Sequence, residues 1–151
     1  MDSHKSLSTE QMNAEAHLFS MVEDHLCVKL KQNHRVYLRQ DRKTFIQPDF
    51  YSKESRIIGE IYAHVGTPKV GQRHKISNDI LKMILFERST GVVFRKILVI
   101  CDHEMEVFLT GSSFIAESIR QFGIEILCME LEQTMIGHIC EAQKRQRMTN
   151  A

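Results

Sequence analysis

Two acidic residues lie in neighbouring stretches of alternating apolar sequence, Asp49 in residues 44–51 and Glu60 in residues 56–65. Alternation of this kind predicts β-strands, in which successive side chains point to opposite faces. Glu60 then shares a face with Tyr62, and pairing of the two strands would set the two carboxylates opposite each other. Carboxylate oxygens are the hard ligands that Mg²⁺ prefers. The spacing therefore predicts a divalent-metal centre suited to chemistry on phosphates.

A helix predicted to begin near Val70 adds further polar side chains beside these acids. A proline ends the second strand just before it, because proline cannot continue a strand ladder. Four of its polar side chains come soon after the end of the second strand, namely those of Gln72, Lys75, Asp79 and Lys82. Two interpretations of Gln72 stay open, a polar contact beside the acids and a cap of its own helix.

A first helix is predicted to begin at Ser8 or Thr9 and to run to about Gln32, because apolar residues recur there at helical spacing. Glu15 and Glu23 fall within the apolar arc of this helix. Two interpretations stay open. Either both glutamates are solvated at the edges of the arc, as is usual for charged residues, or Glu15 is an outer ligand of the acidic centre.

The second half of the chain predicts a unit of strand, helix and strand. Residues 96–102 form a continuous apolar run rich in branched residues, which is typical of a parallel strand buried on both faces. A helical stretch follows, broken at Gly111 and capped again by one of the next two serines, and a second strand covers residues 124–131. This order predicts a βαβ unit. A last helix is expected over about residues 131–147.

The composition is that of an ordinary globular chain. It has 151 residues, of which 42% are hydrophobic and 26% charged, so we expect a single domain over residues 1–151. The net charge of +1 excludes a strong positive field over the whole molecule, so contact with nucleic acid must use a local patch. Residues 34–43, HRVYLRQDRK, carry five basic residues and are predicted to form a short edge strand or an exposed loop.

The cysteines and the apolar segments predict a cytoplasmic protein. The four cysteines form no CxxC pair, which disfavours a zinc finger and fits free thiols in a reducing compartment. The longest apolar runs fall far short of the roughly 20 residues of a membrane span, so we expect no membrane contact. No glycine-rich phosphate loop and no acyl-transfer signature is found in the sequence.

The predicted order of elements resembles the core of the PD-(D/E)XK nuclease superfamily, the restriction-endonuclease-like fold. The likeness is carried by Pro48-Asp49 on one strand and by Glu60-Ile61-Tyr62 on the next. It implies an α/β fold with a restriction-endonuclease-like α-β-β-β-α-β core, a mixed sheet flanked by helices and an extra C-terminal αβα. It also implies that Asp49 and Glu60 bind Mg²⁺ or Mn²⁺. Glu15 is a further ligand of this metal under the second interpretation of the first helix.

The sequence departs from the family pattern at one catalytic position. The resemblance implies a lysine two residues after the glutamate, and Tyr62 stands there. Tyrosine donates a hydrogen bond but supplies no permanent positive charge. Some relatives carry this lysine on a neighbouring helix. Lys75 is here the first candidate for that role, and Lys69 and Lys82 are the next candidates.

Three functions are consistent with these residues. The first is a magnesium-dependent endonuclease that hydrolyses phosphodiester bonds in DNA, with Asp49, Glu60, Lys75, Tyr62 and Gln72 in its active site. We expect a homodimer, because so short a core leaves no separate DNA-recognition domain. The second is a catalytically inactive nuclease-fold protein that binds nucleic acid or a protein partner. The third is an α/β interaction domain in which the two acids are structural.

Overall fold

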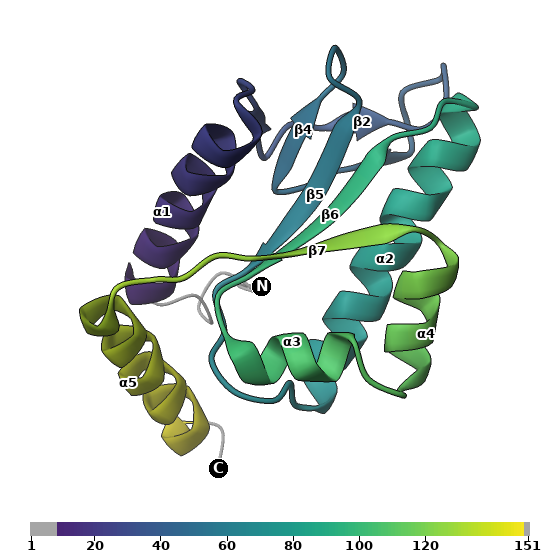
Figure 1. Cartoon of the computed structure of the whole chain (residues 1–151). Coiled ribbons are helices and arrows are strands. Elements are labelled where there is room, and N and C mark those ends of the chain that lie inside the picture. Colours follow the sequence, from purple (N-terminus) through teal and green to yellow (C-terminus); the bar gives the residue numbers. More distant parts are fainter. Residues whose placement is uncertain (1–8, 150–151) are drawn as a thin grey trace.

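The computed structural model describes residues 9–149 and has helices on both faces of a mixed β-sheet (Figure 1). The elements are α1 Thr9–Leu26, β1 Lys31–Gln32, β2 Val36–Tyr37, β3 Phe45–Ile46, β4 Phe50–Ser52, β5 Ile57–Tyr62, α2 Val70–Thr90, β6 Arg95–Ile100, α3 His103–Leu109, α4 Phe114–Gln121, β7 Ile124–Cys128 and α5 Gln133–Thr149. The predicted α/β class is confirmed. Ser8, one of the two predicted helix starts, lies outside the described residues. None of the helices within residues 9–149 combines the length and the apolar character that a membrane crossing needs.

The main sheet has the strand order β1-β4-β5-β6-β7. β4 runs antiparallel to both β1 and β5, whereas β5, β6 and β7 are parallel to one another. All but the first residue of β6 are buried, as predicted for a parallel strand covered on both faces. The chain passes from β6 to β7 through α3 and α4, so the predicted βαβ unit is present.

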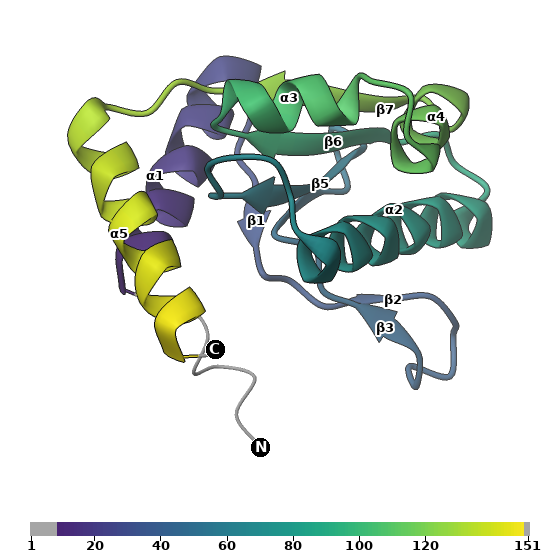
Figure 2. The same cartoon turned by 90° about the horizontal axis from the view of Figure 1, so that it is seen from below.

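The sheet separates two hydrophobic cores. α1 and α5 lie together on one face, and α2, α3 and α4 cover the other (Figure 2). On the first face Leu18 and Ile139 belong to the same core as Val99. On the second face Ile76 belongs to the same core as Leu98. Adjacent residues of β6 thus serve opposite cores, as the two-residue period of a strand requires.

Local signals set the end of α2 and the start of α4. α2 ends at Thr90, where Gly91 adopts a left-handed conformation with φ 69° and its N–H binds the carbonyl of Glu87. α4 begins after Ser113, whose hydroxyl accepts a hydrogen bond from the backbone N–H of Ala116 at 3.1 Å. The predicted break at Gly111 and the new cap after it are confirmed.

The first helix ends earlier than predicted. α1 stops at Leu26 and not near Gln32, because Cys27 adopts a left-handed conformation with φ 53°. Glu23 then stabilises the turn, since its carboxylate accepts a hydrogen bond from the backbone N–H of Leu30 at 2.8 Å. The last two residues of the predicted helix form β1 instead and pair with β4.

The predicted strand over residues 44–51 is in fact two short strands. β3 pairs with β2 in a separate hairpin, whereas β4 joins the main sheet beside β5. Pro48 lies between β3 and β4 and has no N–H to donate to a ladder. The predicted pairing with residues 56–65 is therefore right for β4 and wrong for β3. The predicted short strand in residues 34–43 is present as β2.

Candidate active site

Asp49 and Glu60 lie opposite each other where β4 begins. Asp49 precedes β4 directly, and the register that pairs Phe50 with Gly59 places Asp49 beside Glu60 of β5. The Oδ2 atom of Asp49 accepts a hydrogen bond from the backbone N–H of Ile61 at 2.7 Å, which holds this carboxylate against β5. The Glu60 residue is only 4% exposed. The structure therefore brings these two predicted acids together.

The surroundings of Glu60 favour its protonated form. Burial is the largest cause, followed by the negative charges of Asp49 and Asp79 and by a hydrogen bond with the Asp49 carboxyl group. Together they raise the pKa of Glu60 to about 10, against the opposing effect of Lys82. Glu60 therefore favours its protonated form at neutral pH, in a hydrogen bond with the carboxyl group of Asp49. A divalent cation at this position would favour both ionised carboxylates and release that proton.

Glu15 of α1 lies near this pair of acids without joining it. Burial raises the pKa of Glu15, the charge of Asp49 raises it further, and the charge of Lys75 lowers it. Within residues 9–149, however, no three or more His, Cys, Asp and Glu side chains gather in an arrangement able to hold a metal ion. Asp49 and Glu60 alone fit Mg²⁺ in kind, because Mg²⁺ commonly takes one or two carboxylates and keeps several waters. A ligand role for Glu15 stays a prediction.

Tyr62 is engaged by a carboxylate from α2. Its hydroxyl donates a hydrogen bond to Oδ2 of Asp79, and Nζ of Lys82 lies 3.2 Å from Oδ1 of the same carboxylate. The Asp79 residue is only 2% exposed. Burial and the charges of Asp79 and Glu60 raise the pKa of Tyr62 well above its usual value, so its hydroxyl acts as a donor. Tyr62 cannot supply the positive charge expected of a lysine at this position.

Lys75 is the candidate lysine that contacts Tyr62. Its Nζ lies 4.9 Å from the centroid of the Tyr62 ring, a cation–π geometry. The charge of Lys75 also lowers the pKa of Glu15, the residue of α1 on which the charge of Asp49 acts as well. The other two candidates are placed differently, because Lys82 is held in an ion pair and Lys69 lines a separate pocket beyond the end of β5.

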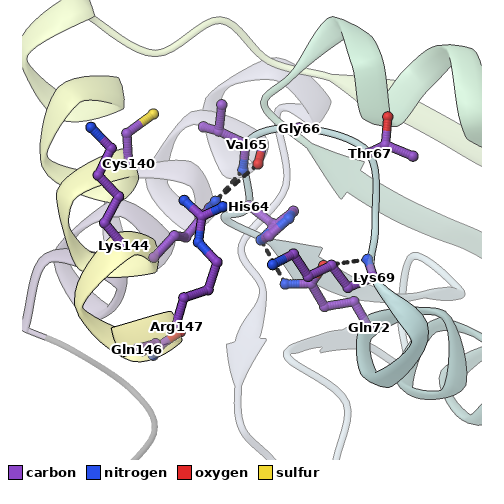
Figure 3. A pocket seen from close by; sticks show the side chains of 11 residues that line it. His64, Val65, Gly66, Thr67, Lys69, Gln72, Cys140, Lys144, Gln146 and Arg147 are labelled. Atoms are coloured by element: carbon purple, nitrogen blue, oxygen red, sulfur yellow. Dashed lines mark hydrogen bonds between the residues drawn. The ribbon is translucent and has the colours of Figure 1, made fainter. Parts of the chain in front are cut away.

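Gln72 binds its own helix start and a histidine. Its Oε1 accepts a hydrogen bond from the backbone N–H of Lys69 at 2.9 Å, and its Nε2 lies 2.8 Å from Nδ1 of His64 (Figure 3). Of the two interpretations of Gln72, the helix cap is therefore the one that the structure favours. Gln72 and His64 line the same pocket, which lies beyond the end of β5.

Sequence reasoning missed two features of this site. The hydrogen bond between Tyr62 and Asp79 had one signal, an acid on the apolar stripe of α2, because a charged residue is seldom buried without a partner. The pocket lined by His64 had no signal, because it forms only when α5 packs beside the segment that follows β5.

Comparison of the chain with protein-family models, with curated proteins and with solved structures gave no match. The resemblance to the PD-(D/E)XK nucleases thus rests on the order of elements and on the residues of the site. Any function assigned to this site has to follow from its geometry and its charges.

Proposed function

We propose that this protein is a metal-dependent nuclease that hydrolyses phosphodiester bonds in DNA at the pair of acids Asp49 and Glu60. The observation that carries this proposal is the contact between the two carboxyl groups, of which Glu60 is deeply buried. Within the described residues no lysine or arginine forms an ion pair with Glu60. Burial of acids without a cation is costly, and such a cost is typical of functional sites.

The order of elements supports the same proposal. α1, the antiparallel strands β1, β4 and β5, then α2 and β6 follow the α-β-β-β-α-β order of the restriction-endonuclease-like core, with the β2–β3 hairpin inserted after β1. β6 is parallel to β5, the strand that carries the glutamate. The segment from α3 to α5 corresponds to the extra C-terminal αβα. Membership of this fold family is part of the proposal.

Each residue of the site has a distinct role in this mechanism. Asp49 and Glu60 would hold Mg²⁺ or Mn²⁺ through their ionised carboxylates. When bound, the metal lowers the pKa of a water molecule and offsets the charge of the scissile phosphate. Lys75 stabilises the negative charge that develops on the phosphate, in place of the lysine missing at residue 62. Tyr62 positions this centre through its hydrogen bond to Asp79.

The β2–β3 hairpin supports DNA as the substrate. Residues 31–46 contain five lysines and arginines and a single acid, whereas the whole chain has a net charge of only +1. The guanidinium of Arg35 lies 4.6 Å from the ring centroid of Phe45, and that of Arg42 lies 4.7 Å from the ring centroid of Tyr37. Basic side chains beside aromatic rings suit contact with phosphates and bases. The hairpin is thus the local patch that DNA binding requires.

Cleavage of plasmid DNA in the presence and absence of Mg²⁺ or Mn²⁺ tests this proposal. We expect slow, metal-dependent cutting by the wild type and none by Asp49→Asn or Glu60→Gln. The matched control is Glu54→Gln, which removes an exposed acid from the turn between β4 and β5 and should leave cutting unchanged. Metal should also raise the melting temperature of the wild type and not of the two site variants. Absence of both cutting and thermal shift in the wild type would contradict the proposal.

The second candidate function is a nuclease-fold protein that binds nucleic acid or a protein partner without cutting. The observation that favours it is the engagement of Tyr62 with Asp79 at the position where the family pattern has a lysine. Binding of DNA through the β2–β3 hairpin without any metal-dependent cutting would identify this function. A homodimer and a cytoplasmic location stay predictions from the sequence in either case.

A further inference from the structure

A cavity of about 630 Å³ lies between α5 and the segment that connects β5 to α2. The connecting segment contributes His64 and Lys69, the first turn of α2 contributes Gln72, and α5 contributes Lys144 and Arg147 (Figure 3). The cavity therefore joins parts of the chain that lie more than 60 residues apart. It exists only in the folded protein.

The lining of this cavity is cationic and contains no acid among the described residues. Lys69, Lys144 and Arg147 all line it, and within residues 9–149 none of the three forms an ion pair with a carboxylate. Figure 3 shows the side chains of Lys69 and Arg147 pointing from opposite walls into the space between α5 and α2. Two cationic side chains that point into one cavity provide an attractive field for an anion.

The neutral residues of the cavity are held in fixed positions. Gln143 of α5 binds the backbone of Val65 twice, accepting from its N–H at 2.9 Å and donating to its carbonyl at 3.0 Å. Burial lowers the pKa of His64, and the positive charges of Lys69 and Arg147 lower it further against the opposing charge of Asp102. His64 is therefore a neutral hydrogen-bonding group at physiological pH, in a cavity that lysine and arginine side chains also line.

Two elements connect the cavity with the candidate active site. His64 follows Tyr62 by two residues, a Cα separation of no more than about 7 Å. On α2, Gln72 precedes Lys75 by three residues, and positions three apart on a helix are neighbours. The cavity thus lies only a few residues beyond the strand and the helix turn that carry the acidic pair and Lys75.

We propose that this cavity binds a phosphate group of the nucleic-acid strand, next to the phosphate that is cut at the acidic pair. Lys69 and Arg147 bind its oxygens as charged donors, and Arg147 has the planar fork that suits a phosphate. The inference rests on the proposed nuclease function and adds to it a second phosphate-binding position, supplied by α5. It assigns a binding role to a helix outside the restriction-endonuclease-like core.

The test is the affinity of the full chain for a short, fluorescently labelled single strand, measured without divalent metal at several salt concentrations. The double variant Lys69→Gln/Arg147→Gln is compared with Lys53→Gln/Arg88→Gln, which removes the same two types of charge from exposed positions outside the cavity. We expect the cavity variant to bind on the order of tenfold more weakly than the control. The slope of the logarithm of its binding constant against the logarithm of salt concentration should decrease in magnitude by about 0.7 for each phosphate that the protein no longer neutralises. Melting curves confirm that both variants are folded.

Inorganic phosphate as a competitor separates the two sources of the anion. If the cavity binds a phosphate of the strand, inorganic phosphate weakens strand binding by the wild type and has less effect on the cavity variant. Strand binding by the cavity variant equal to that of the control would overturn the inference, even if the wild type bound free phosphate. A wild type that binds the strand without cutting it would remove the nuclease function and leave the cavity assignment intact.

Discussion

The acidic pair and the cationic cavity differ in the burial and in the sign of their ionisable side chains. At the acidic pair, Glu60 is deeply buried and its carboxyl group is hydrogen-bonded to that of Asp49. In the cavity beyond the end of β5, the exposed side chains of Lys69 and Arg147 point into open space. Within residues 9–149 no ion pair joins these acids to these cations. An acidic pair at one end and a cationic cavity at the other suit ligands of opposite sign, a metal cation and a phosphate.

Different elements hold the two ends in place. The acids are fixed by the ladder between β4 and β5 and by the bond from Ile61 to Asp49. The cavity depends on α5, which lies beside α1 and binds it through Gln146 and Gln11 at 3.2 Å. Changes in the sheet should therefore affect the acidic pair first, and changes in α5 should affect the cavity first.

The largest expected effect is on the pH dependence of stability. The pKa of Glu60 is raised from an ordinary value of 4.5 to about 10, so between these values the folded state binds more protons than the unfolded state. The stability that this proton provides is complete below pH 4.5 and declines as pH rises towards 10, by up to about 1.4 kcal/mol per pH unit. Glu60→Gln should remove this decline. Urea unfolding between pH 5 and 9, in the presence of a metal chelator, measures this decline in the free energy of unfolding. Identical pH profiles for the wild type and Glu60→Gln would contradict the prediction.

The second effect concerns Lys75. Lys75→Gln should slow metal-dependent cutting on the order of a hundredfold, as is typical when one electrostatic group is removed from a transition state. The fold should persist, because Lys75 contacts the ring of Tyr62 and carries no ion pair within the described residues. Lys53→Gln, in the turn before β5, is the control for removal of a positive charge. Unchanged cutting by Lys75→Gln would transfer the role to Lys69 or Lys82.

The third effect tests the scaffold of the acidic pair. A Cβ at Gly59 would lie 2.0 Å from Cζ of Phe50 and 2.6 Å from the carbonyl oxygen of Ile97, so Gly59→Ala must displace a ring or a strand. Overpacking of this kind costs about 1–3 kcal/mol, measurable by chemical unfolding. Gly137→Ala in α5 is the matched control, because a Cβ there has nothing within 4 Å and should stabilise the helix slightly. Equal stability of the two variants would show that β4 and β5 can move apart freely.

The sequence predicts well those parts of the fold that local signals determine. The apolar run of β6, the left-handed Gly91 after α2 and the Ser113 cap of α4 each act through neighbouring residues. The apposition of Asp49 and Glu60 also follows from the two-residue period of strands, once β4 and β5 pair. These predictions needed no knowledge of distant contacts.

The sequence fails where a feature depends on distant parts of the chain. Cys27 ends α1 in a left-handed conformation that its residue type does not favour, and β1 exists only through its pairing with β4. The engagement of Tyr62 by Asp79 depends on how α2 docks on the sheet. The cavity depends on α5. From the sequence alone, Arg147 is an ordinary basic residue in the last turn of this helix.

The smallest expected effect separates the cavity from the acidic pair. Gln143→Ala removes both hydrogen bonds to the backbone of Val65 and should cost about 1 kcal/mol, because the N–H and the carbonyl are only part-buried and can bind water instead. Gln121→Ala, which removes an exposed hydrogen bond to Glu117, is the control and should cost less. Since Gln143 belongs to α5 and touches neither acid, the pH dependence due to Glu60 should persist in Gln143→Ala while affinity for the single strand falls. Loss of that pH dependence would show that the two ends of the site are one cooperative unit, and that the stability of β5 near Glu60 depends on α5.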